Sequence, residues 1–138
     1  MNELIDELIE AFEGGRIANT DFHHANHVRM AWTYLREYGF PAGAERFVTA
    51  LQRFAAANGK PQLYHATITW AYLVTIFDRM QNGESLAGSW ESFAGANADL
   101  LTWKPSIIDA LYRPETIASA HAKRVFVLPN RLLPQESL

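Results

Sequence analysis

The 138-residue chain contains no cysteine. This absence excludes disulfide bonds, thiolate metal ligands and cysteine nucleophiles. Five histidines are therefore the side chains best suited to bind a transition metal or to exchange a proton near neutral pH. Any metal site in this chain must be built from nitrogen and oxygen ligands.

Long apolar runs and an excess of positive charge are also missing. The longest strongly apolar stretch, residues 68–77, covers about 10 residues, whereas a membrane-spanning helix needs about 20. The net charge of −3 provides no overall basic field for nucleic acid or anionic lipid. The acidic start of the chain lacks the positive segment of a signal peptide. We therefore expect a cytoplasmic protein that binds neither nucleic acid nor membrane.

Several short catalytic signatures are absent as well. The chain has no GxSxG element of an α/β-hydrolase and no HExxH element of a zinc protease. The pair Gly14-Gly15 is not followed by the Gly-Lys-Ser/Thr of a phosphate-binding loop. These enzyme classes receive no support from the sequence.

The composition is that of a globular domain, with 49% hydrophobic and 20% charged residues. A length of 138 residues predicts one domain, residues 1–138. Glycine, proline and asparagine punctuate four main helical segments, in which apolar residues recur at helical spacing. The first is capped by Asn2 and ends at Gly14; the second is capped by Thr20 or Asp21 and runs to Tyr38; the third runs from Pro41 to Asn58; the fourth runs from Pro61 to about Met80.

Shorter helices are predicted over residues 85–97 and 106–112, and from Pro114 to about Lys123. The segment Val125-Phe126-Val127 is too short for an isolated strand, so we expect an extended C-terminal arm on the helices. The predicted fold is an all-α, antiparallel helical bundle. Its fourth helix is apolar on nearly every side, which predicts that it is the buried central helix.

Two histidines fall on the apolar face of the second helix. At about 100° per residue, His24 and His27 share a stripe with Val28, Ala31, Tyr34 and Leu35. Their spacing of three residues lets the two imidazoles converge. His23 lies at the edge of this stripe, and Arg29 projects from nearly the opposite side.

Alternating helix directions bring further polar residues to the same end of the bundle. The start of the fourth helix contributes His65 and, one turn later, Thr69. The end of the first helix contributes Glu10 and Glu13. The topology therefore predicts a polar cluster at this end.

Three interpretations of the cluster stay open. In the first, His24, His27 and His65 bind zinc or iron, with Glu13 or Glu10 as a further ligand, and a metal-bound water supports a hydrolytic or related reaction.

The second interpretation is a metal-free pocket for a small molecule, in which a histidine acts as an acid or base and Tyr34, Tyr64 or Tyr72 donates a hydrogen bond. In the third, the histidines are structural and the protein is a binding or interaction module. Exposed aromatic residues between Trp90 and Trp103 also suggest a homodimer.

Two segments resemble a family of small, uncharacterised bacterial helical proteins. The first, residues 22–32 (FHHANHVRMAW), matches F-x-H-x-x-H-[VL]-R-x-A-W, and the second, residues 64–69 (YHATIT), matches Y-H-x-T-I-T. A closing segment, residues 122–129, extends the similarity over nearly the whole chain. The resemblance implies that His24, His27, Arg29, His65 and Thr69 are the residues to examine, whereas His23 occupies a variable position. It implies no activity.

Overall fold

The computed structural model describes residues 2–18, 22–82 and 88–131. Within these ranges the chain forms helices and irregular connections and contains no strand, which confirms the predicted all-α fold. No helix in the described ranges is long and apolar enough to cross a membrane. The elements are α1 (Asn2–Glu13), α2 (His24–Tyr38), α3 (Ala42–Ala57), the 3-10 turn η2 (Pro61–Leu63), α4 (Ala66–Asn82), α5 (Trp90–Ala96), α6 (Ala98–Leu101), α7 (Ile107–Leu111), α8 (Pro114–Ile117) and α9 (Ala120–Arg124).

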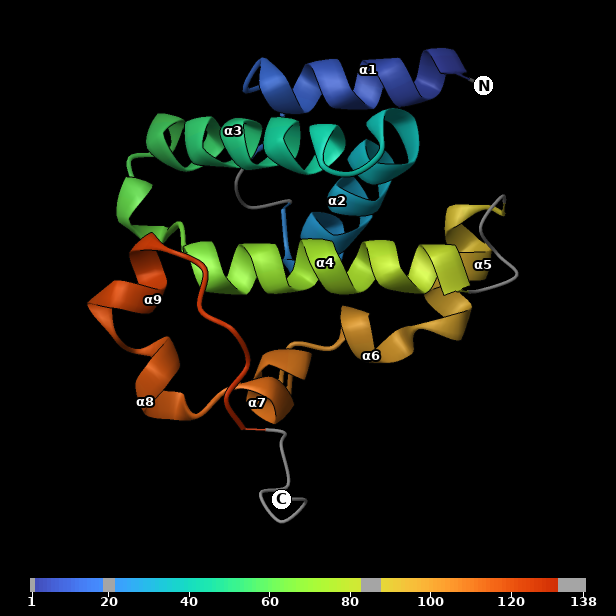
Figure 1. The fold of residues 1–138 in the computed structure, drawn as a ribbon. Coiled ribbons are helices and arrows are strands. Elements are labelled where there is room, and N and C mark those ends of the chain that lie inside the picture. Colours follow the sequence, from blue (N-terminus) through green and yellow to red (C-terminus); the bar gives the residue numbers. More distant parts are fainter. Residues whose placement is uncertain (1, 19–21, 83–87, 132–138) are drawn as a thin grey trace.

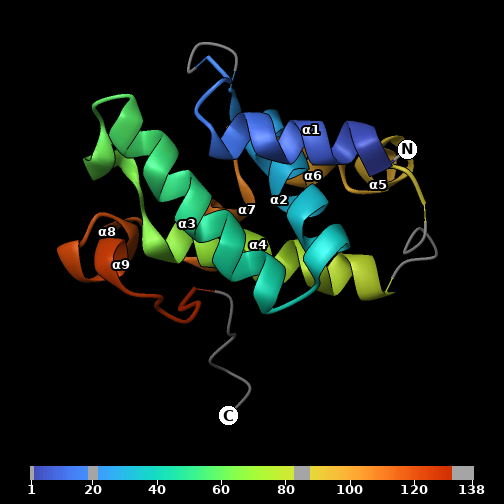
Figure 2. The ribbon, with the colours of Figure 1, turned by 90° about the horizontal axis from the view of Figure 1, so that it is seen from above.

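The four long helices, α1 to α4, form stacked layers. Helix α1 lies along α3, whereas α4 lies on the other side of α3, and α2 crosses between these layers (Figure 1). Seen from above, α2 occupies the centre of the molecule (Figure 2). Helices α6 to α9 and the C-terminal arm lie on the α4 side (Figure 1).

The most completely buried helix is α2, and not the fourth helix as the sequence predicted. Residues 30–35 of α2 are all buried, because α1, α3, α4 and α6 contact it. In α4, Val74 is 46% exposed and Trp70 and Phe77 are half-buried. The composition of α4 therefore identified an apolar helix, but the burial of a helix depends on how many other helices surround it.

Two of the predicted helix starts were placed too early. Helix α2 begins at His24, where the Asn26 side chain accepts a hydrogen bond from the His23 N–H at 3.0 Å. The caps predicted for this helix, Thr20 and Asp21, lie outside the described residues. Helix α4 begins at Ala66, because Pro61 opens the separate turn η2 and Tyr64 is extended.

The later helices are also shorter than predicted. Helix α5 begins after Ser89, whose hydroxyl accepts the Ser92 N–H at 3.1 Å, while the predicted start at residues 85–87 lies outside the described residues. The predicted helix from Pro114 to about Lys123 consists of α8 and α9. The Ser119 hydroxyl separates them, because it accepts the Ala122 N–H at 3.0 Å and so begins a new helix.

An extended arm follows α9 up to residue 131, as predicted, while the predicted continuation with Pro134 lies outside the described residues. The buried Thr67 hydroxyl donates to the Val125 carbonyl at 2.8 Å and accepts the Val127 N–H at 3.1 Å. The Tyr112 hydroxyl also donates to the Val127 carbonyl, at 2.6 Å. These bonds hold the arm against α4 and α7.

Candidate functional site

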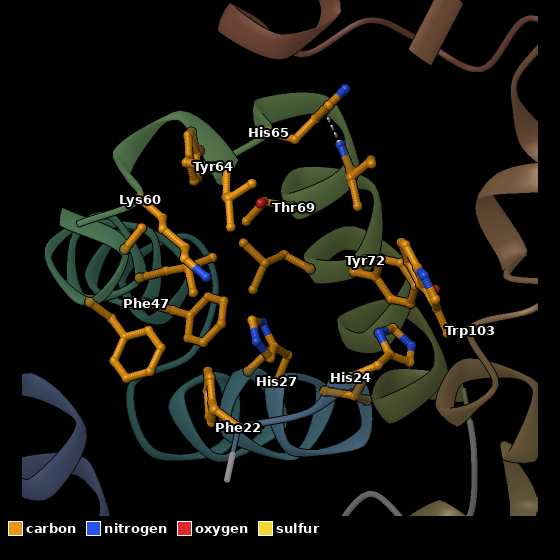
Figure 3. A pocket seen from close by; sticks show the side chains of 18 of the residues that line it. Phe22, His24, His27, Phe47, Lys60, Tyr64, His65, Thr69, Tyr72 and Trp103 are labelled. Carbon is orange, nitrogen blue, oxygen red and sulfur yellow. Dashed lines mark hydrogen bonds between the residues drawn. The ribbon is translucent and has the colours of Figure 1, made fainter. Parts of the chain in front are cut away.

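A cavity of about 530 Å³ lies between α2, α3, η2 and α4 (Figure 3). Most of its lining residues are aliphatic or aromatic, and a few carry polar groups. They are Phe22, His24, His27, Val28, Ala31, Phe47, Leu51, Phe54, Ala55, Asn58, Lys60, Leu63, Tyr64, His65, Ile68, Thr69, Tyr72, Leu73, Ile76 and Trp103.

Packed aromatic rings form one wall of the cavity. The rings of Phe22 and Phe54 have centroids 4.9 Å apart, and Phe12 behind them stacks on Phe47 at 6.0 Å. On α4, Leu73 and Ile76 are fully buried. The wall is therefore apolar and closely packed.

His27 projects from α2 into the cavity (Figure 3). Its ring lies 4.1 Å from the Phe22 ring, centroid to centroid. Burial lowers the pKa of His27 to about 4, His24 adds to this effect, and a backbone contact with Phe22 opposes it. The imidazole is therefore neutral at pH 7 and offers one N–H donor and one nitrogen acceptor.

His24 forms part of the wall toward Trp103. Its Nε2–H donates to the Leu100 carbonyl at 2.9 Å, and its ring lies 5.1 Å from Tyr72 and 4.9 Å from Trp103, centroid to centroid. Burial lowers the pKa of His24, and the bond to Leu100 acts in the opposite direction. One ring nitrogen is thus committed to the backbone of α6.

His65 is bound to the backbone through both ring nitrogens. Its Nδ1 accepts the Ile68 N–H at 3.2 Å, and its Nε2–H donates to the Ile117 carbonyl at 2.8 Å. In Figure 3 the ring extends away from the middle of the cavity. His65 therefore begins α4 and attaches it to α8, and neither nitrogen is available to a ligand in this arrangement.

Glu13 and Tyr34 lie outside the cavity. The Tyr34 hydroxyl donates to Glu13 Oε2 at 2.8 Å, and the Arg46 guanidinium contacts the same carboxylate at 2.7 and 3.1 Å. The Arg46 guanidinium holds the pKa of Glu13 below its usual range, and Tyr34 adds to the effect. Helix α1 packs on the far side of α3 from α4, so its acidic end does not meet the histidines; Glu10 is likewise absent from the lining.

Of the other residues predicted for the pocket, Thr69 lines the cavity, whereas His23 and Arg29 do not. Thr69 lines the cavity, as predicted. His23 is exposed at the start of α2 and does not line it. Arg29 lies on the opposite side of α2, as the helical wheel predicted, and its guanidinium lies over the Trp90 ring at 5.8 Å from the centroid.

The described residues contain no group of three or more histidine, aspartate or glutamate side chains placed to hold one metal ion. His65 and Glu13 have other partners, so only His24 and His27 remain close together. Binding of zinc or iron stays a prediction from the sequence, and the geometry does not favour it.

Lys60 and Trp103 are among the cavity residues that were not identified from the sequence. Lys60 stands between α3 and η2, and Trp103 follows α6; both line the cavity and both are exposed. The position of Lys60 carried a usable signal, because it is the only lysine or arginine between the third and fourth helices. No sequence pattern pointed to Trp103, because its place in the cavity wall depends on the path that the chain takes through α5 and α6.

Comparison with known proteins adds no information on this site. No family model, curated protein or solved structure matches the chain. The resemblance to the bacterial helical family therefore stays a prediction.

Proposed function

We propose that the protein binds a small, mainly apolar organic molecule in the cavity between α2, α3 and α4, without a metal ion. The observation that carries this proposal is the cavity itself. Its volume of about 530 Å³ and its mainly apolar lining are typical of small-molecule sites, which enclose about 300–1,000 Å³.

Exposed apolar side chains support the same conclusion. Leu63 is 65% exposed and Trp103 is 44% exposed, and both line the cavity. A ligand with an apolar body covers this surface and removes it from water, which is favourable.

The polar groups favour binding over acid–base catalysis. His27 and Thr69 approach the cavity from α2 and α4 (Figure 3), so they can orient one polar group of the ligand. An efficient general base needs a pKa near the working pH, whereas that of His27 is about 4. We therefore assign His27 to ligand orientation.

The test measures binding of naphthylmethanol, a neutral fluorescent alcohol, by fluorescence and calorimetry. Ala55→Trp places an indole in the cavity, and Ala56→Trp places it on the exposed side of the same helix. We expect the wild-type protein and Ala56→Trp to bind the alcohol, and Ala55→Trp to lose at least about tenfold in affinity, or 1.4 kcal/mol.

Equal affinity in the three proteins would contradict binding in this cavity. The same titrations are repeated with EDTA and with added zinc. Binding that requires zinc and is lost in both His24→Gln and His27→Gln would overturn the metal-free proposal and support the metal site predicted from the sequence.

A further inference from the structure

We infer that the ligand is an organic monoanion, such as a carboxylate with an apolar body, and that Lys60 is its counter-ion. This inference rests on the proposed function and names the chemical class of the ligand. It comes from the position of one cation at the rim of an otherwise apolar cavity.

The backbone around Lys60 is fixed by the end of α3. The Gly59 N–H bonds to the Ala56 carbonyl at 2.9 Å, and the Lys60 N–H bonds to the Ala55 carbonyl at 2.8 Å. Gly59 has φ of 73°, so the pattern is a Schellman motif with glycine in the left-handed region. The Leu63 N–H then bonds to the Lys60 carbonyl at 3.0 Å, which fixes the start of η2.

This local structure directs the Lys60 side chain toward the cavity. In Figure 3 it extends past Phe47 toward the middle of the lining residues. Because hydrogen bonds fix the backbone on both sides of Lys60, its side chain starts at the rim of the cavity. The ammonium is therefore within reach of a ligand bound there.

The lining has a single formal charge, and it is positive. Among the lining residues of the described chain there is no aspartate or glutamate, and Lys60 is the only lysine or arginine. The described residues contain no ion pair to Lys60. An apolar wall strengthens the field of a nearby charge, so the cavity favours a negative group at the Lys60 end.

Two donors from different elements can hold one carboxylate. Lys60 supplies an ammonium and Thr69 a hydroxyl, whereas the single N–H of neutral His27 is shared with the Phe22 backbone. Hydrogen bonds in which donor or acceptor is ionised are about twice as strong as neutral ones. A doubly charged group, such as a phosphate monoester, would leave one charge without a cationic partner next to an apolar wall, and such a group is expensive to bury.

The experiment compares naphthoate with naphthylmethanol, which share an aromatic body and differ in charge. Calorimetry is done on wild type, Lys60→Met and Lys60→Arg, with Lys123→Met as the control, because Lys123 lies on α9 and does not line the cavity. We expect the wild-type protein to bind naphthoate about tenfold more tightly than the alcohol. Lys60→Met should lose this preference, whereas Lys60→Arg and Lys123→Met should keep it.

Salt provides a second readout. The preference for naphthoate should shrink as the ionic strength is raised, because Lys60 is at the solvent-exposed rim. A wild-type protein that binds the alcohol as tightly as the acid, or a Lys60→Met variant that keeps the preference, would overturn this inference alone. A protein that binds neither compound would overturn both this inference and the proposed function.

Discussion

The three histidines predicted to share one site have different environments. His27 contributes a neutral imidazole to the cavity, His24 donates to the backbone of α6, and His65 uses both nitrogens to hold α4. Residue type and spacing brought His24 and His27 together correctly, because one helix carries both. Residue type and spacing could not show which ring nitrogens bond to the backbone. The Ile117 partner of His65 lies 52 residues away, and the Leu100 partner of His24 lies 76 residues away.

At the residue scale, the low pKa of His27 predicts a specific pH dependence of stability. The ordinary pKa of 6.5 falls to about 4 in the folded protein, so between these values the unfolded chain binds more protons than the folded one. The contribution of His27 to the free energy of unfolding is therefore fully present above pH 6.5 and is lost as the pH falls toward 4. At 1.36 kcal/mol per pKa unit, His27 accounts for a loss of up to about 3 kcal/mol.

Urea unfolding of wild type and His27→Gln at pH 7 and pH 4.5 measures this contribution. His24 is present in both proteins, so the difference between them reports His27 together with its interaction with His24. The wild-type protein should lose more unfolding free energy on acidification than His27→Gln. Parallel pH dependence in the two proteins would show that His27 is not held in an apolar environment.

At the element scale, helix ends were predicted better than helix starts or helix partners. Gly39 and Gly59 end α2 and α3 as expected, because a glycine with positive φ terminates a helix locally. The start of α4 was misplaced, since its cap is the His65 side chain and that ring is held by α8. The periodicity of α1 identifies its apolar face but not the helix against which this face packs. Glu13 was therefore assigned to the wrong side of the bundle.

The role of His65 at the start of α4 predicts the effects of two substitutions. His65→Ala removes the bonds to Ile68 and Ile117 and should lower the free energy of unfolding by about 1–3 kcal/mol. His65→Asn keeps a side-chain acceptor at the helix start and should recover part of this loss. Urea unfolding measures both values at pH 7.

Binding of naphthylmethanol to the folded His65 variants provides the control. It should match wild type, because the ring is attached to α8 and points away from the middle of the cavity. A His65→Ala protein with wild-type stability and no ligand binding would instead place His65 in the site.

At the scale of the whole molecule, the cavity lies where the three long helices α2, α3 and α4 meet, and the C-terminal third of the chain supports it from outside. The lining comes from residues as far apart as Phe22 and Trp103, so the site exists only in the folded chain. Thr67 on α4 connects the two parts, since it bonds to Val125 and Val127 across 58 and 60 residues.

Replacing Thr67 should loosen this connection. Thr67→Val has the same shape but leaves the Val125 carbonyl and the Val127 N–H without their partner, and we expect a loss of about 1–3 kcal/mol. Thr67→Ser keeps the hydroxyl and serves as the matched variant. Hydrogen exchange at the Val127 amide should become faster in Thr67→Val and change less in Thr67→Ser; equal exchange in wild type and Thr67→Val would contradict the arrangement of the arm.

Ligand binding should stabilise the whole fold, because the unfolded chain has no cavity. At a free ligand concentration 100 times the Kd, the expected gain is about 2.7 kcal/mol. A crystal structure with a brominated naphthylmethanol tests binding in the cavity most directly, because anomalous scattering locates the bromine. We expect a bromine peak inside the cavity between α2, α3 and α4. A peak only elsewhere on the protein, or density for a metal ion held by His24, His27 and His65, would contradict it.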